Sequence, residues 1–204
     1  MPASMVHLYI GYQFQQSCHL VHNKPQFYLG CIAPDAVNLD GFAPKDIRYT
    51  AHLRKADLDD WMQNVIDFYT EYKEKLDDDF LLGYVLHIFS DIAWDKKYDH
   101  LLWAALKKRG LPKEQQFGAR WEELFAFDQL QFDEKWWTEH VALELKKSKA
   151  IPINNIDADL IDRYRIFKVD KNLQALQYDT PRVLTQELMD EYANYAIALL
   201  KNAL

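Results

Sequence analysis

The sequence predicts an all-α protein, a compact multi-helix bundle of about seven to nine helices. Apolar residues recur at steps of three and four along most of the chain, which is the period of an amphipathic helix. With only 6 Gly and 7 Pro, the chain has too few turn residues for many short strands. A hydrophobic content of 49% is enough for a buried core.

Residues 79–94 are predicted to form the central helix. They are apolar nearly all round, which is typical of a helix that is buried on every side. The acidic run 77–79 precedes them and favours a helix start there, because carboxylates cap and stabilise helix N-termini.

Further helices are expected before and after this segment. Pro34 ends the second one, and residues 34–51, with their Pro, Asn and Gly, are predicted to be a loop. No repeat or low-complexity linker interrupts the pattern, so residues 1–204 are predicted to form a single domain. The other predicted helices are 3–16, 24–33, 57–76, 96–109, 112–128, 133–147, 157–177 and 182–203.

Charge and composition exclude several classes of function. With 24 basic and 31 acidic residues the net charge is −7, so the chain lacks the basic footprint of a nucleic-acid-binding protein. No apolar run is long enough to span a membrane, and no signal peptide is visible. Cys18 and Cys31 make no disulfide framework, which indicates a reducing compartment, and a cytoplasmic location is expected.

The central helix carries the first candidate site residues. Gly83, His87 and Asp91 are spaced by four and therefore share one face. A carboxylate among apolar residues is costly unless it is paired or bound to a metal. The pair is therefore either a metal-binding pair or two groups that hydrogen-bond to each other or to a neighbouring helix.

Three further residues are candidates, each with an ordinary explanation. Asp35 follows the helix-ending Pro34 and is either a turn carboxylate or a ligand directed inward. His52 lies at the end of the predicted loop, where a solvated histidine is common. His7 lies in an apolar segment, where a hydrogen-bonded core histidine is common.

Taken in order, His7, Asp35, His52 and the His87-xxx-Asp91 pair resemble the ligand series of the bacterial zinc-dependent phospholipase C family. The wider fold of that family includes the single-strand-specific zinc nucleases. The strings FYLGCIAPDAVN and LLGYVLHIFSDIAWD look especially like its small, unsecreted members. The resemblance covers about the first 100 residues well, and the second half only as a helical pattern.

The resemblance implies an all-helical metal-dependent phosphoester hydrolase. Asp35, His52, His87 and Asp91 would hold one zinc ion, and Asp91 would bridge to a second one that His7 also holds. Mixed nitrogen and oxygen ligands also accept manganese or iron. Two such ions, about 3.5–4 Å apart, activate water and stabilise a phosphoryl displacement. We expect Asp35 to orient the attacking water, and the substrate to be a small phosphoester or a phospholipid.

The sequence departs from the family at the amino terminus and at the third ion. The family's N-terminal amine is a ligand, but six residues precede His7, so that site is expected to be either weaker or completed by water. The family's third ion needs two later histidines and an acid. His140 and Glu144 have the right spacing but follow His87 by 53 residues, and His100 is a poor match. Asp95 is left open as a ligand, a supporting acceptor or a helix end.

Two rival functions remain at this point. An HD-type phosphohydrolase is also helical and metal-bound, but the chain contains no His-Asp dipeptide. A binding or structural helical domain that keeps a metal site without catalysis is the alternative from a different class.

Overall fold

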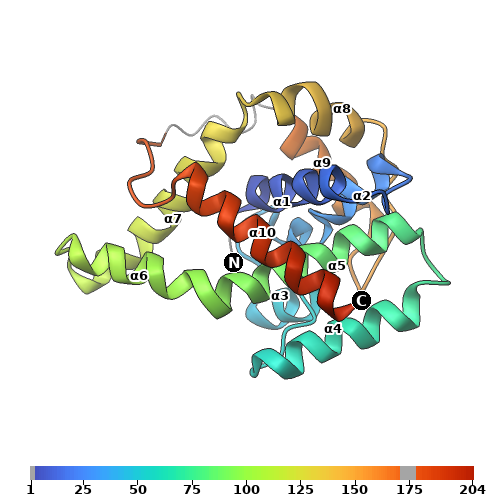
Figure 1. The fold of residues 1–204 in the computed structure, drawn as a ribbon, viewed down its shortest axis with the longest axis horizontal. Helices are drawn as coiled ribbons and strands as arrows, with labels where there is room; N and C mark the ends of the chain where they lie inside the picture. Colours follow the sequence, from blue (N-terminus) through green and yellow to red (C-terminus); the bar gives the residue numbers. More distant parts are fainter. Residues whose placement is uncertain (1–2, 171–177) are drawn as a thin grey trace.

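The computed structural model describes residues 3–170 and 178–204. Within these ranges the chain forms ten α-helices and no β-strand, which confirms the predicted all-α bundle (Figure 1). The α-helices are α1 Ser4–Ser17, α2 Lys24–Gly30, α3 Lys45–Ala51, α4 Leu58–Tyr72, α5 Asp78–Ala93, α6 Asp99–Lys108, α7 Lys113–Gln131, α8 Ala142–Leu145, α9 Ala158–Val169 and α10 Gln186–Ala203.

Helix α5 is the predicted central helix. It contacts α1, α2, α4 and α10, and Figure 1 shows it running behind α10 through the middle of the molecule. Of its sixteen residues, all but Asp78 and Leu82 are buried. The Asp77 side chain accepts a hydrogen bond from the Phe80 N–H and so caps the helix as expected.

Two glycines let α2 and α5 pack backbone to backbone. A Cβ atom at Gly83 would lie 2.0 Å from the Phe27 carbonyl oxygen, and one at Gly30 would lie 2.1 Å from the Phe80 carbonyl oxygen. The space that Gly83 leaves on the His87 side of α5 is therefore filled by the α2 backbone. This contact sets the position of the segment that follows α2.

π-Helical turns occur at two places in the chain. Residues Trp94–Tyr98 join α5 to α6, and residues Trp136–Val141 lead into α8. The sequence predicts a break between two helices at 94–96. The structure instead has a wider helical turn there, so α5 and α6 form a nearly continuous helix. A π turn inserts an extra residue, so side chains beyond it leave the face predicted from four-residue spacing.

The predicted loop at 34–51 was wrong in part. It contains the short 3₁₀ helix η1, Ala33–Asn38, and helix α3. Pro44 precedes α3 with a φ of −48°, close to the helical value that a proline ring imposes. Proline therefore precedes a helix here, whereas the predicted loop took it only as a helix breaker.

The last two predicted helices are shorter than expected. Helix α9 ends at Val169, and the part of the predicted helix at 171–177 lies outside the described residues. Helix α10 begins after Thr185, whose side chain accepts a hydrogen bond from the Leu188 N–H. Among the described helices, none combines the length and apolar character that crossing a bilayer requires.

Candidate metal centre

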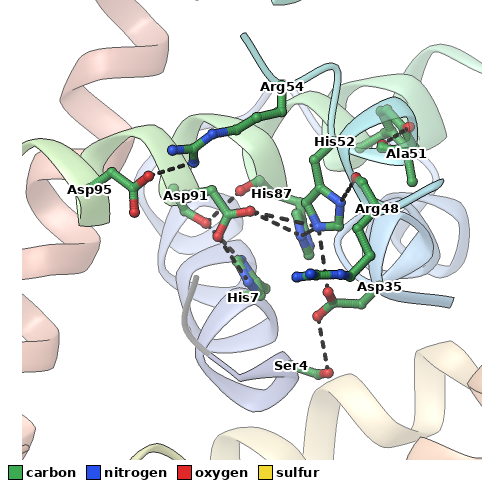
Figure 2. Close-up of polar contacts among 12 residues, drawn as sticks. Ser4, His7, Asp35, Arg48, Ala51, His52, Arg54, His87, Asp91 and Asp95 are labelled. Carbon is green, nitrogen blue, oxygen red and sulfur yellow. Dashed lines mark hydrogen bonds and ion pairs between the residues drawn. The ribbon is translucent and has the colours of Figure 1, made fainter. Parts of the chain in front are cut away.

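Five side chains from four elements meet beside α5, and we call them the His–Asp cluster (Figure 2). Helix α5 supplies His87 and Asp91, which lie one turn apart and are 1% and 0% exposed. The cluster consists of His7, Asp35, His52, His87 and Asp91.

Helix α1 brings His7 to the cluster. Its ring stacks on the ring of His87, with 3.6 Å between the centroids and 16° between the planes. The first eight residues of α1, Ser4–Gly11, are all buried. The seven besides His7 are apolar or small, so the start of this helix lies inside the core. The lone histidine of an apolar segment thus points at a second histidine.

The segment between α2 and α4 supplies the other two members. Asp35 lies in η1 and is mostly buried, and His52 directly follows α3 and is 1% exposed. The Trp61 indole N–H donates to the His52 carbonyl oxygen at 2.8 Å, which holds the end of α3 against α4. The prediction that a histidine here is often solvated does not apply, because α3 turns it inward.

Each imidazole is oriented by a hydrogen bond at Nδ1. His87 Nδ1 lies 2.8 Å from the Cys31 carbonyl oxygen, and His52 Nδ1 lies 2.8 Å from the Arg48 carbonyl oxygen. A carbonyl only accepts, so both rings carry their proton on Nδ1. In the neutral rings this leaves a lone pair on each Nε2 atom.

His7 also carries its proton on Nδ1, but here the acceptor is a hydroxyl group. Its Nδ1 lies 2.7 Å from Ser90 Oγ, and Ser90 Oγ donates to the His87 carbonyl oxygen at 2.6 Å. Since the serine proton is already committed, the His7 N–H donates to the serine. His7 Nε2 has no hydrogen-bond partner in the described part of the chain.

The free Nε2 atoms and the two carboxylates face one another. His52 Nε2 lies 3.3 Å from His87 Nε2 and 3.5 Å from an oxygen of Asp35. The same nitrogen is 3.7 Å from Asp91 Oδ2.

Asp91 also faces the ring from α1. His7 Nε2 lies 3.7 Å from Asp91 Oδ1. Two three-residue groups therefore have ligand atoms within 4.8 Å of one another: His7 with His87 and Asp91, and Asp35 with His52 and His87.

Burial and mutual charge shift the pKa values inside the cluster. Burial lowers the pKa of His87 to about 4 and raises that of Asp91 to about 7. Burial also lowers the pKa of His7 well below its ordinary value. Burial thus keeps both rings neutral, whereas Asp91 loses solvation without gaining a hydrogen-bond donor, so its negative charge is costly unless a cation lies beside it.

The two members nearest the surface behave differently. Burial alone would lower the pKa of His52, but the hydrogen bond to Asp35 and the charge of Asp91 raise it above its ordinary value. For Asp35, burial opposes ionisation, yet the His52 hydrogen bond and the charges of His87 and His7 hold its pKa below the ordinary value. A positive charge is therefore favoured between these two residues, carried either by a proton or by a metal ion.

The donor set fits a divalent metal ion such as zinc. Both carboxylate oxygens of Asp91 are buried and lack hydrogen-bond partners within the described ranges, as does His7 Nε2. Orphaned buried acceptors of this kind cost free energy unless a cation neutralises them. Imidazole rings held by carbonyl oxygens and a hydroxyl group match the supporting hydrogen bonds of zinc-bound histidines.

The remaining candidates lie elsewhere. His100 is exposed, and exposed His140 stacks on the Tyr12 ring with 5.8 Å between the centroids. Glu144 pairs with Lys147 Nζ at 2.9 Å. The π turn at Trp136–Val141 ends between His140 and Glu144, so their apparent four-residue pairing is not that of a regular helix. Asp95, one turn beyond Asp91, pairs with Arg54 at the rim of the cluster (Figure 2).

Sequence reasoning missed the groups that orient the rings. Ser90 was not singled out, and the carbonyl oxygens of Cys31 and Arg48 carry no side-chain signal at all. Ser90 follows His87 by three in the same helix, and this spacing was a usable signal. The amino terminus, which the resemblance made a candidate ligand, lies outside the described residues.

The fold and the cluster define a class: an α-helical protein with a buried nitrogen and oxygen donor site suited to a divalent cation. Over residues 6–179 the chain matches the family described as zinc dependent phospholipase C. The match covers most of the chain, so the protein belongs to the zinc dependent phospholipase C family. The name of the family indicates dependence on zinc and phospholipase C activity. Neither the curated proteins nor the solved structures contain a match to the chain.

Proposed function

We propose that the protein is a zinc-dependent phosphoester hydrolase whose ligands are His7, Asp35, His52, His87 and Asp91. The observation that supports this most is the convergence of three Nε2 lone pairs and two carboxylates at separations of 3.3–3.8 Å. Such a cluster repels itself unless a cation or protons occupy it. Family membership favours zinc, and the donor set also accepts manganese or iron.

The ligands divide between two ions. His87 has a single free lone pair and can bind one ion only, which we assign to the ion held by Asp35 and His52. Asp91 has two unpartnered oxygens, and Oδ1 faces His7 while Oδ2 faces His52. Asp91 is therefore proposed to bridge the ions, with water completing the site at His7.

Zinc, when bound, lowers the pKa of water and stabilises negative charge on a phosphoryl oxygen. The role of this chain is to orient the attacking water and to exclude bulk solvent. Asp35 suits the orienting role because its side chain is 10% exposed, whereas that of Asp91 is 0% exposed. Its Oδ2 atom also accepts a hydrogen bond from Ser4 Oγ at 3.4 Å, which holds the carboxylate at the open side of the cluster.

The substrate is proposed to be a small phosphoester or a phospholipid. A pocket of about 430 Å³ opens beside the cluster, and Asp35 belongs to its wall. This volume accommodates a compact group rather than a long polymer. Cys18 and Cys31 are both free thiols, which agrees with a proposed cytoplasmic location.

A second candidate is a helical domain in which the metal site has a structural role. It is favoured by the position of His100, His140 and Glu144, which leaves no third ion site of the kind the family resemblance implies among the described residues. In this case removal of the metal would lower stability without any loss of turnover.

Elemental analysis and a phosphodiesterase assay test the proposal together. We expect about two zinc ions per chain and hydrolysis of bis(4-nitrophenyl) phosphate that EDTA abolishes and zinc restores. Bound zinc without turnover, with a melting temperature that falls in EDTA, would favour the structural alternative. Absence of bound metal would contradict both candidates.

A further inference from the structure

The pocket beside the cluster, which we call the aromatic pocket, contains polar groups that the proposed metal site does not use. It lies between η1, α7, α9 and the start of α1. One helical stripe lines it with Trp121, Phe125 and Asp128 of α7 and with Phe132 directly after this helix, spaced by three and four. Asp35 is the member that the pocket shares with the His–Asp cluster.

Asp128 is a buried carboxylate with an unused acceptor. It is 7% exposed, and its Oδ2 atom accepts a hydrogen bond from the Met5 N–H at 3.1 Å. Its Oδ1 atom has no partner in the part of the chain that the structure describes. A buried acceptor in a pocket wall is costly unless a ligand or water donates to it.

Two donors belong to residues that line the same pocket. The Trp121 indole N–H is also buried without a partner among the described residues. Lys168 lines the pocket and lies over the Tyr164 and Phe167 rings, at 5.3 and 5.2 Å from their centroids. The pocket wall therefore combines an unpartnered acceptor, an unpartnered donor and an ammonium group with several aromatic rings.

These groups restrict the charge of the ligand. With Asp35 taken up by the proposed metal ion, Asp128 and Lys168 give the pocket wall one charge of each sign, so a ligand cation would meet the ammonium group of Lys168. A second anionic group would meet the carboxylates of Asp35 and Asp128. An uncharged hydroxyl group donates and accepts at once, so it satisfies Asp128 and a donor together. The C–H faces of a polyol pack against aromatic rings.

We propose that the aromatic pocket binds a polyhydroxylated alcohol, a sugar or cyclic polyol, as the alcohol half of the phosphoester. The inference rests on the proposed function, because the phosphoryl group is taken to lie at the Asp35 end of the pocket. Ser4 supports this arrangement, since its hydroxyl lies 2.6 Å from the Tyr164 hydroxyl and also contacts Asp35.

Calorimetric titration with two matched diesters tests the proposal. Glycerophosphoinositol and glycerophosphocholine differ only in the alcohol under test, and each is titrated into the full chain with zinc and with EDTA. We expect the inositol diester to bind at least about tenfold more tightly in both conditions. Equal affinity, or a preference for choline, would overturn the proposal.

Pocket variants localise the effect. Asp128→Asn retains an acceptor for the Met5 N–H but loses the charged acceptor at Oδ1, and it should weaken inositol diester binding about tenfold. Its control is Asp190→Asn, which alters the acceptor of the Tyr9 hydroxyl outside the pocket. Trp121→Phe should weaken binding severalfold, while Trp103→Phe, whose indole pairs with Asp99, should not. Unchanged binding in folded Asp128→Asn protein would overturn the proposal.

Separate measurements identify the source of the polyol and test the proposed hydrolase function. Cosedimentation with vesicles of phosphatidylinositol in phosphatidylcholine assigns the group to a lipid, and binding of the soluble diester alone assigns it to a soluble ester. Binding preference in EDTA tests the pocket without metal. A preference that persists in a protein without zinc-dependent turnover would support the pocket and contradict the proposed hydrolase. Zinc-dependent turnover without the preference for the inositol diester would support the proposed hydrolase and contradict the polyol pocket.

Discussion

Two His-xxx-acid sequences lie in the two halves of this chain, and they have opposite surroundings. His87 and Asp91 lie in α5, enclosed by α1, α2, α4 and α10. His140 and Glu144 lie where a π turn meets α8, with His140 exposed and Glu144 paired to Lys147. The same spacing thus yields a convergent donor pair only where other elements bury it and orient the ring nitrogens.

The burial of α5 depends on the close contact of its backbone with that of α2 at Gly83. In the second half of the chain, Gly118 has no such contact. Gly83→Ala would place a Cβ atom 2.0 Å from the Phe27 carbonyl oxygen, so we expect a loss of about 3 kcal/mol or more in stability. Gly118→Ala, at an exposed position of α7, meets no atom within 4 Å and should be neutral or stabilising by up to about 1 kcal/mol. Thermal or urea unfolding measures both. Equal effects would show that α2 and α5 do not pack this closely.

The two histidines themselves provide the next comparison. His87→Ala removes a ligand of the ion that Asp35 and His52 are proposed to hold, so the zinc content should fall and turnover should drop by at least about 10³-fold. His140→Ala should leave the zinc content and turnover unchanged, because its exposed ring stacks on that of Tyr12 and belongs to neither group of candidate ligand atoms. Atomic absorption and the diester assay measure the pair, with circular dichroism as the control for folding. Retention of zinc by the first variant would argue against the ligand assignment.

Orientation of the rings is a smaller effect than their presence. Ser90→Ala removes the acceptor that holds His7 Nδ1 while the ring itself remains, and zinc affinity should fall about 10- to 100-fold. Competition with a chromogenic chelator measures the change. Ser148→Ala is a matched control, since this buried hydroxyl donates to the Leu145 carbonyl oxygen away from the cluster. Equal affinity in the two variants would remove Ser90 from the supporting role.

The smallest effect is expected at the rim. Arg54 pairs with Asp95 one turn beyond Asp91, but the two side chains are 22% and 21% exposed. Pairs this exposed contribute about 1 kcal/mol or less to stability. Arg54→Ala should therefore lower the unfolding free energy slightly and leave the zinc content intact. Loss of zinc would instead place this arginine among the groups that support the cluster.

Much of the fold could be predicted because helical periodicity is local. The apolar segment at 79–94 and the acidic run before it identified α5 and its cap. Helix α3 was missed because Pro44 signals a helix start as readily as a helix end. The π turns were missed because they arise where packing of one helix on others favours a wider turn, which no short pattern predicts.

The sequence by itself determined the helical class, the buried central helix and five candidate ligands, because periodicity and side-chain chemistry are written residue by residue. Only the tertiary structure decided that these five side chains share one space while His140 and Glu144 do not. It also decided which ring nitrogens are free, because the Cys31 and Arg48 carbonyl oxygens that orient the rings are backbone atoms common to every residue. Their role depends on the path of the backbone in the folded protein. The aromatic pocket beside Asp35 likewise forms only when separate segments of the chain pack together.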